Sequence, residues 1–220
     1  YEYRLPGAPI PWGITVDRSG RTWITQKGAN SIARVDAPNA FEYFIPTTGC
    51  QPWGIATSKD YDDIWFTEET AGKIGMFDPV NNRFCEWTLP YPSKAFPRGI
   101  TMNITKMSQT QRPPQYDVWF TEWGANRIGH LHQNITTPGG APDPTKIRFS
   151  FFNITRPPGA GVGTNTQPLS IAMSPIDYSV WFTEYNTTRI SSIRLLENGT
   201  AIFRHYDTSA GGTPYTNNLW

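Results

Sequence analysis

The stretch "WFTEWGANRIGHL", residues 119–131, occurs in related form four times along the chain. Residues 65–77 read "WFTEETAGKIGMF", residues 181–193 read "WFTEYNTTRISSI", and residues 23–35 give the more divergent "WITQKGANSIARV". A second short element precedes each copy: "PWGI" at 11–14 and 52–55, "PRGI" at 97–100 and "PLSI" at 168–171. An apolar and aromatic stretch such as "FEYFIP" or "FCEWTLP" follows each copy. The chain therefore repeats one unit four times.

Each unit reads as four short strands, and the composition favours the same structure. Aromatic residues make up 14% of the 220 residues, with 19 Gly and 20 Pro, which suits short strands joined by tight turns. The first prolines of successive "PxGI" elements are 41, 45 and 71 residues apart (11 to 52, 52 to 97, 97 to 168). The first two spacings match one four-stranded blade of a β-propeller. Pro- and Gly-rich insertions near 103–115 and 133–165 lengthen the third unit.

Stacking of the blades explains why two large aromatic residues adjoin in "WFTE". Neighbouring side chains of a strand point to opposite faces, so the Trp packs toward one adjacent blade and the Phe toward the other. We therefore expect an all-β propeller in which four tryptophans hold equivalent, largely buried positions on the second strand of each blade: Trp23, Trp65, Trp119 and Trp181.

The chain is expected to be a single domain over 1–220, with blade units at about 9–49, 50–94, 95–165 and 166–210. Residues 211–220 resemble the opening of a further blade, and "YEYRLP" at the start resembles an outer strand. Either the two ends pair to close the ring, or these blades belong to a larger ring of six or seven. The second reading is preferred.

Charge and hydropathy exclude some partners and leave the compartment to other signals. The formal net charge of +1 gives no reason to expect nucleic acid, and no apolar run is long enough to span a membrane. Five Asn-x-Thr sequences exceed the number expected by chance and predict a secreted glycoprotein, although chance Asn-rich turns remain an alternative. They begin at Asn103, Asn134, Asn153, Asn186 and Asn198, and all five are expected in loops or at strand ends. The two cysteines, Cys50 and Cys85, could form one disulfide or remain two separate thiols.

The combination "PxGI…WFTE…NRIG" resembles the streptogramin B lyase (virginiamycin B lyase) family, and more loosely NHL-type and SMP-30/gluconolactonase-like propellers. The resemblance implies a propeller ring of seven blades. For members with lyase activity it also implies a Mg²⁺-dependent carbon–oxygen lyase that linearises a cyclic depsipeptide by elimination. The family's site has a His just before the Gly-Ile of one blade, a Glu two residues ahead of it, and the Glu that ends the "WFxE" strand of the same blade.

Only part of that set has a counterpart in this sequence. The positions that correspond to the His are Trp12, Trp53, Arg98 and Leu169, and those that correspond to the preceding Glu are Ile10, Gln51, Phe96 and Gln167. The "WFxE" position alone matches, with Glu68, Glu122 and Glu184 in three units and Gln26 in the first. An acceptor kept in every blade favours a structural role, such as accepting hydrogen bonds from backbone N–H groups, over a metal-binding role for one of them.

Two other groups of residues are candidate sites. Trp12, Trp53 and Arg98, with the flanking Gln51 and Gln167, should surround one mouth of the central channel, where they either bind a glycan or peptide or simply plug the pore. His130 and His132 lie two apart on a predicted strand and could bind a metal, although two ordinary strand residues are the simpler reading.

The sequence thus predicts a non-catalytic structural or binding module, secreted and without a cofactor, whose partner is a glycan, a peptide or another copy of itself. The alternative is a Mg²⁺-dependent lyase, or a lactonase-like hydrolase, whose essential His lies in blades outside this segment.

Overall fold

The computed structural model describes residues 4–5, 9–36, 39–58, 62–105, 115–134, 146–155, 165–196, 198–208 and 215–218. Within them the secondary structure comprises seventeen strands and one four-residue helix, α1 (Pro92–Ala95). "YEYRLP" at the start and both long insertions of the third unit lie mostly outside the described residues.

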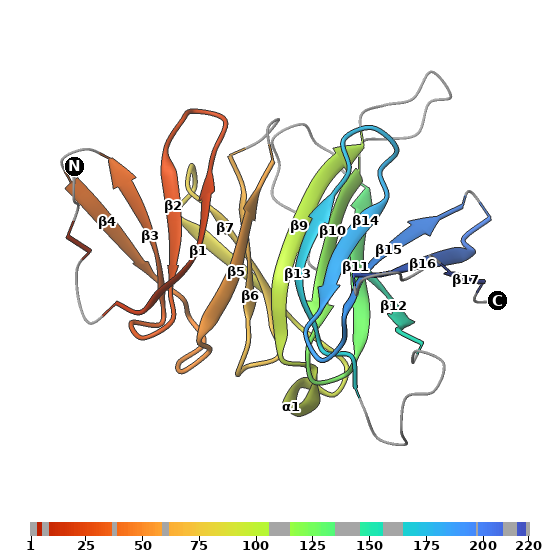
Figure 1. Cartoon of the computed structure of the whole chain (residues 1–220). Helices are drawn as coiled ribbons and strands as arrows, with labels where there is room; N and C mark the ends of the chain where they lie inside the picture. Colours follow the sequence, from red (N-terminus) through yellow and green to blue (C-terminus); the bar gives the residue numbers. More distant parts are fainter. Residues whose placement is uncertain are drawn as a thin grey trace.

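The strands form four antiparallel sheets that lie next to one another in a row (Figure 1). The first sheet contains β1 (Pro11–Val16), β2 (Thr22–Gln26), β3 (Ser31–Asp36) and β4 (Asn39–Phe44). The second contains β5 (Pro52–Thr57), β6 (Ile64–Glu68), β7 (Lys73–Asp78) and β8 (Arg83–Thr88). The third contains β9 (Pro97–Thr105), β10 (Gln115–Glu122), β11 (Arg127–Asn134) and β12 (Arg148–Asn153). The fourth contains β13 (Pro168–Met173), β14 (Val180–Glu184), β15 (Arg189–Leu195), β16 (Ala201–Asp207) and β17 (Tyr215–Asn218).

Each repeated unit of the sequence is one sheet, with its strands in chain order from the inside outward. The prediction of four-stranded propeller blades is confirmed. The last described strand, β17, pairs antiparallel with β16. It therefore extends the fourth sheet, where the sequence suggested the start of a further blade.

The innermost strands contact one another in succession, β1 with β5, β5 with β9, and β9 with β13. The first and fourth sheets lie at opposite ends of the row (Figure 1). The three interfaces between neighbouring sheets hold the hydrophobic core, which falls into three clusters of buried residues, one at each interface.

The "WF" pair packs as its alternation predicts. Trp65 belongs to the cluster between the second and third sheets, whereas Phe66 belongs to the cluster between the first and second. Trp119 and Phe120 divide in the same way around the third sheet. The four tryptophans occupy equivalent positions, but the expectation that all are buried is wrong for one: Trp23, Trp65 and Trp119 are at most 5% exposed, whereas Trp181 is 38% exposed. Trp181 points away from the third sheet, and no described element covers that face.

The Thr of the repeated phrase joins neighbouring sheets. The hydroxyl of Thr67 accepts a hydrogen bond from the Gly54 N–H at 2.8 Å and donates to the Arg98 carbonyl of the next sheet at 2.7 Å. A Cβ atom at Gly54 would lie 2.2 Å from that carbonyl oxygen, so this close approach requires glycine. The first and third sheets repeat the arrangement.

Candidate functional site

A shared β-bulge shapes one end of every blade. In all four sheets the pairing of the innermost strand with its neighbour shifts register within the "PxGI" element. A bulge re-aims side chains and interrupts pairing. The second residue of the element therefore does not follow the regular in–out alternation of side chains along the strand. This residue is Trp12, Trp53, Arg98 or Leu169 in the four blades.

The side chains at these positions and their neighbours form a ladder across the mouth. The rings of Trp12 and Trp53 have centroids 4.1 Å apart. The guanidinium of Arg98 lies 4.4 Å from the Trp53 ring centroid and 3.8 Å from that of Trp123. Trp123 in turn lies 5.1 Å from Tyr185. One or two residues from each blade thus build a continuous aromatic and cationic surface, stabilised by cation–π contacts.

One carboxylate neutralises much of the positive charge in this ladder. Glu69 accepts from Lys27 Nζ at 2.6 Å and from Arg98 Nε at 2.7 Å, and the Lys27 ammonium also lies 4.4 Å from the Trp53 ring centroid. Both cations are therefore held by the protein itself, and the three groups leave a net charge of +1.

Sequence reasoning missed four members of the ladder: Lys27, Glu69, Trp123 and Tyr185. The signal was present, because each residue directly follows the repeated Glu or Gln of its blade. The backbone N–H of each one donates to the residue that precedes the "PxGI" proline, for example Trp123 to the Phe96 carbonyl at 3.2 Å and Tyr185 to the Gln167 carbonyl at 3.0 Å. These bonds bring the two positions together at the mouth.

A hollow of 350 Å³ lies beside the ladder. Gln51, Arg98 and Gln167, all predicted mouth residues, line it together with Trp123 and Phe96. Trp12 and Trp53 do not line the hollow, although Trp53 contacts Arg98, which does. The structure therefore brings three of the five predicted residues into one cavity and places the two tryptophans at its side.

The walls of this hollow contain unusual backbone. Gln51, Phe96 and Gln167 have φ values of 50°, 44° and 52°, although each precedes a proline. Left-handed conformations are costly for residues other than glycine, and a following proline restricts the backbone further. Such strain persists only where the surroundings enforce it, and it concentrates at functional sites. Here the carbonyl groups of these three residues accept backbone hydrogen bonds from the turn after the second strand of the same blade. These bonds hold the strained conformation.

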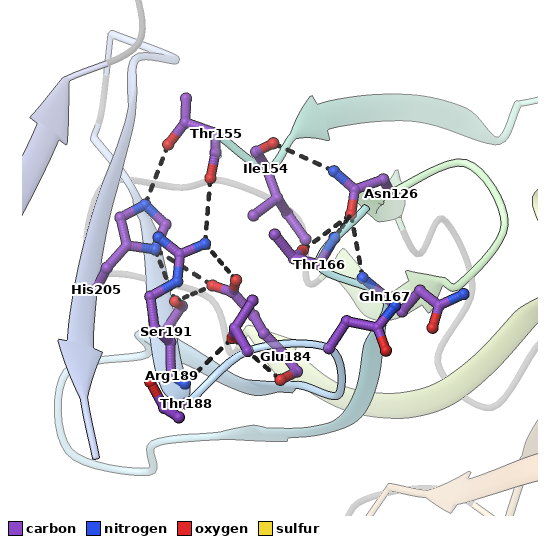
Figure 2. A network of polar contacts seen from close by, with 12 residues as sticks. Asn126, Ile154, Thr155, Thr166, Gln167, Glu184, Thr188, Arg189, Ser191 and His205 are labelled. Atoms are coloured by element: carbon purple, nitrogen blue, oxygen red, sulfur yellow. Dashed lines mark hydrogen bonds and ion pairs between the residues drawn. The ribbon is translucent and has the colours of Figure 1, made fainter. Parts of the chain in front are cut away.

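The repeated acid is buried in the three blades that carry it. Glu184 is the centre of a polar network (Figure 2). It forms an ion pair with Arg189, whose Nη2 also donates to the Thr155 carbonyl at 3.2 Å. The Ser191 hydroxyl contacts Glu184 and lies 2.7 Å from His205 Nδ1, while His205 Nε2 lies 3.2 Å from the Thr155 hydroxyl. Burial alone would raise the pKa of Glu184, but the bonds from His205 and Ser191 and the Arg189 charge lower it.

The same acid has different partners in the other blades. Glu122 accepts from Arg127 Nε at 2.8 Å, and burial raises its pKa although Arg127 opposes the shift. Neither oxygen of Glu68 accepts a hydrogen bond from a described residue, and burial with the neighbouring Glu86 raises its pKa to about 9. Gln26 in the first blade contacts the Ser31 hydroxyl at 3.4 Å.

These contacts refine the structural interpretation of the repeated acid. Where Glu122 and Glu184 accept hydrogen bonds, the donors are side chains of the following strands and not the backbone N–H groups expected from the sequence. The backbone donors of the turn are instead satisfied by backbone carbonyls, as in the Gly72 N–H bond to Glu68 O at 2.9 Å.

The Asn of "GANSI" and "GANRI" is a second structural residue that sequence reasoning overlooked. Asn126 has a φ of 55°. Its side-chain oxygen accepts from the Thr166 and Gln167 N–H groups at 2.7 and 3.2 Å, and its amide donates to the Ile154 carbonyl (Figure 2). It thereby holds the segment that leads into the fourth blade and its Gln167. Asn30 holds the segment before the second blade in a similar way, through the Cys50 N–H at 2.7 Å.

The residues present do not fit the Mg²⁺ site that the family resemblance implies. Mg²⁺ needs several oxygen ligands brought together. Among the described residues the repeated acids are buried, Glu122 and Glu184 are paired with arginines, and Glu69 at the mouth is paired with two cations. No group of three or more His, Cys, Asp or Glu side chains in the described part of the chain could hold a metal ion.

The two cysteines are free thiols, so the disulfide that the sequence allowed does not form. Cys50 packs in the core between the first and second sheets, whereas Cys85 packs against the core between the second and third. The second sheet therefore lies between them.

The two strand histidines lie near each other, as their spacing predicts, with ring centroids 5.3 Å apart. His130 Nε2 lies 2.9 Å from Asp117 Oδ1, and the His130 ring stacks on Trp119 with centroids 4.1 Å apart. These contacts are those of buried strand residues.

Four of the five glycosylation sequences can be placed. Asn153, Asn186 and Asn198 are exposed at the end of β12 and in two turns, as expected. Asn103 lies within β9, opposite Asp117, and is only partly exposed, which differs from the expected loop or strand end. The side chain of Asn134 lies outside the described residues. No helix in the described part of the chain has the length and apolar character needed to cross a membrane.

Antiparallel sheets packed face to face in succession, with their innermost strands side by side, define a β-propeller. Residues 2–139, more than half of the chain, match the model of the Virginiamycin B lyase family. The chain belongs to this family.

Solved structures agree with the family and the fold. A catalytically inactive virginiamycin B lyase from Staphylococcus aureus, crystallised with quinupristin, is 25% identical with a TM-score of 0.63, over 99% of this chain and 73% of that one. A streptogramin B lyase is 24% identical with a TM-score of 0.64, over 100% and 69%. A putative 6-phosphogluconolactonase from Bacteroides uniformis shares the fold at 12% identity, with a TM-score of 0.60 over 99% and 62%. No curated protein sequence matches the chain significantly.

Proposed function

We propose that this chain is a secreted, N-glycosylated β-propeller that acts as a non-catalytic binding module. It binds through the mouth, where Gln51 and Gln167 lie beside the aromatic and cationic ladder. Its partner is a glycan, a peptide or a second copy of the chain. The observation that carries the proposal is the hollow of 350 Å³, whose volume lies in the range of small-molecule sites and which amide, guanidinium and aromatic side chains line together.

The chemistry of the mouth supports binding and offers little for catalysis. The family's His and preceding Glu positions hold Trp12, Trp53, Arg98 and Leu169, and Ile10, Gln51, Phe96 and Gln167. Without an imidazole or an unpaired carboxylate, the described mouth residues provide no general base suited to neutral pH. The five Asn-x-Thr sequences support secretion and glycosylation.

Calorimetric titration of the secreted protein with short oligosaccharides and peptides tests the binding role, followed by mass spectrometry of the recovered ligand. We expect saturable binding and an unchanged ligand. Trp123→Ala should weaken the binding, whereas Phe44→Ala, an exposed aromatic residue on β4, should not. Conversion of the ligand, or equal binding by both variants, would contradict the proposal.

Family membership favours a second candidate function, a Mg²⁺-dependent lyase of the streptogramin B lyase type. The related structure crystallised with quinupristin makes that compound the natural probe. Chromatography of quinupristin incubated with the protein and Mg²⁺ tests this candidate, because ring opening changes its retention. Opening that stops on addition of a chelator would replace the binding role with the lyase role.

A further inference from the structure

Amide side chains line the hollow at several positions. Among the described residues, neither the Gln51 nor the Gln167 side chain forms a hydrogen bond, and Asn165 contributes a third amide to the lining. Each primary amide offers two donors and an acceptor with two lone pairs. The hollow therefore presents donors and acceptors of neutral character at adjacent positions.

The charged groups in the same wall contact one another and the aromatic rings. Arg98 donates through Nε to Glu69 and lies between the rings of Trp53 and Trp123. Glu69 is shared with Lys27. A ligand that relied on a strong charge would have to compete with these short contacts, whereas a neutral ligand need not disturb them.

The lining also includes aromatic surface beside the amides. Phe96 and Trp123 both border the hollow, and Phe96 is an exposed side chain. Aromatic rings offer flat apolar surface to the C–H face of a ligand, while amides bind its hydroxyl groups. The volume of 350 Å³ suits a small molecule and cannot hold a folded partner.

We propose that the ligand of this hollow is a neutral carbohydrate of one or two sugar rings, bound through its hydroxyl groups by Gln51 and Gln167 and against the rings of Phe96 and Trp123. This inference rests on the proposed binding function and names its ligand class. A sugar matches the wall because its hydroxyls both donate and accept and its C–H faces are apolar. The strained backbone at three positions of the rim is then what aims the side chains at the ligand.

The positive φ values allow the amide side chains to be removed without straining the backbone. Gln51→Gly and Gln167→Gly each remove an amide, and glycine adopts φ values near 50° without strain. The fold should therefore remain intact or become more stable. Asn82→Gly is the matched control, because it also removes an exposed amide side chain at positive φ (49°). Asn82 lies in the turn between β7 and β8, at the opposite end of the second blade from Gln51.

Saturation-transfer NMR with N-acetyl-D-glucosamine, D-galactose and D-mannose at millimolar concentration measures the binding, and triglycine serves as the peptide probe. We expect transfer to at least one sugar. Its affinity should fall about fivefold in Gln51→Gly and in Gln167→Gly, as for the loss of one neutral hydrogen bond, and should not change in Asn82→Gly. Thermal melts should show no loss of stability in any of the three variants.

Three results would overturn the inference, and they separate its failure from that of the binding function. Sugar binding that is equal in all variants would place the sugar elsewhere. Binding of triglycine alone, weakened in the two Gln variants, would reject the carbohydrate and retain the binding function. Binding of none of the probes would reject the carbohydrate and remove the support for the binding function as well.

Discussion

The second and fourth blades carry nearly the same phrase, yet they use it differently. All five residues of β6, "IWFTE", are buried, whereas β14, "VWFTE", alternates between buried and exposed residues. The second sheet lies between two others, and the fourth is covered by a described neighbour on one face alone. Burial of a repeated residue thus depends on the adjoining blade, while its place on the strand depends on its own sequence.

The largest expected difference between the two blades concerns the repeated Trp. Trp65→Ala should destabilise the protein by about 3–5 kcal/mol, the usual cost of removing a large buried aromatic side chain. Trp181→Ala should cost about 1 kcal/mol, because Trp181 packs on one side against Tyr206 and is 38% exposed. Urea unfolding measures both values. Equal losses would show that something covers the outer face of the fourth blade in solution.

For the repeated acid, the larger loss of stability is expected in the fourth blade and the smaller one in the third. Glu184→Gln should cost about 3 kcal/mol, because it leaves the buried Arg189 cation without its carboxylate. Glu122→Gln should cost about 1–2 kcal/mol, since Arg127 is more exposed and also lies over the Phe151 ring. The same unfolding experiment compares them. A loss below about 0.5 kcal/mol for Glu184→Gln, which is the usual scatter of surface substitutions, would rule out an essential ion pair.

The stability contributions of Glu68 and Glu184 should depend on pH in opposite directions. The folded pKa of Glu68, about 9, lies above the ordinary glutamate value of 4.5, so between these pH values the folded state binds a proton that the unfolded state has lost. The carboxyl group therefore destabilises the fold progressively as pH rises from 4.5 to 9. Glu68→Gln should become more stable than the parent by about 1 kcal/mol per pH unit in this window. Glu184, whose pKa is lowered, should instead stabilise the fold above the ordinary glutamate pKa of 4.5. That contribution should be lost as the pH falls below this value.

Unfolding curves at pH 3, 4, 5, 6, 7 and 8 decide the contrast between the two acids, because the Glu184 effect falls below pH 4.5 and the Glu68 effect above it. A parallel pH dependence for the parent and Glu68→Gln would mean that Glu68 is ionised in the fold and has a partner.

The smallest effect concerns the Thr that joins the blades. Thr67→Val removes the hydroxyl that bridges Gly54 and the Arg98 carbonyl and should cost about 1–2 kcal/mol. Thr183→Val should cost less than about 0.5 kcal/mol, because Thr183 is exposed and bonds to Ser170 within its own sheet. Thermal melts of the two variants give the comparison. Similar losses would indicate that the bridge between sheets contributes nothing.

Much of the fold followed from the sequence because the signal is repeated. Four copies of one phrase specify four sheets, their strand order and the opposite directions of Trp65 and Phe66. The mouth was predictable for Gln51, Arg98 and Gln167, since their place before or within "PxGI" puts them at one end of every blade.

The remaining features depend on contacts between blades, which no single repeat contains. Glu69 binds cations from the first and third blades, and Trp181 is 38% exposed on a face of the fourth sheet that no described element covers. The pKa of the repeated acid likewise depends on whether an Arg, a Glu or a His lies beside it, and the direction of its shift differs among the three blades.

The central claim is that the repeated acid supports the fold where it is paired with an arginine, as in Glu122 and Glu184, and takes no part in metal-dependent chemistry. Calorimetric titration of the parent protein and of Glu122→Gln with Mg²⁺ tests it most directly. We predict no saturable binding in the micromolar range for either protein, together with a lower unfolding temperature for Glu122→Gln. Micromolar Mg²⁺ binding by the parent that disappears in Glu122→Gln would show that Glu122 is a metal ligand and would contradict the account.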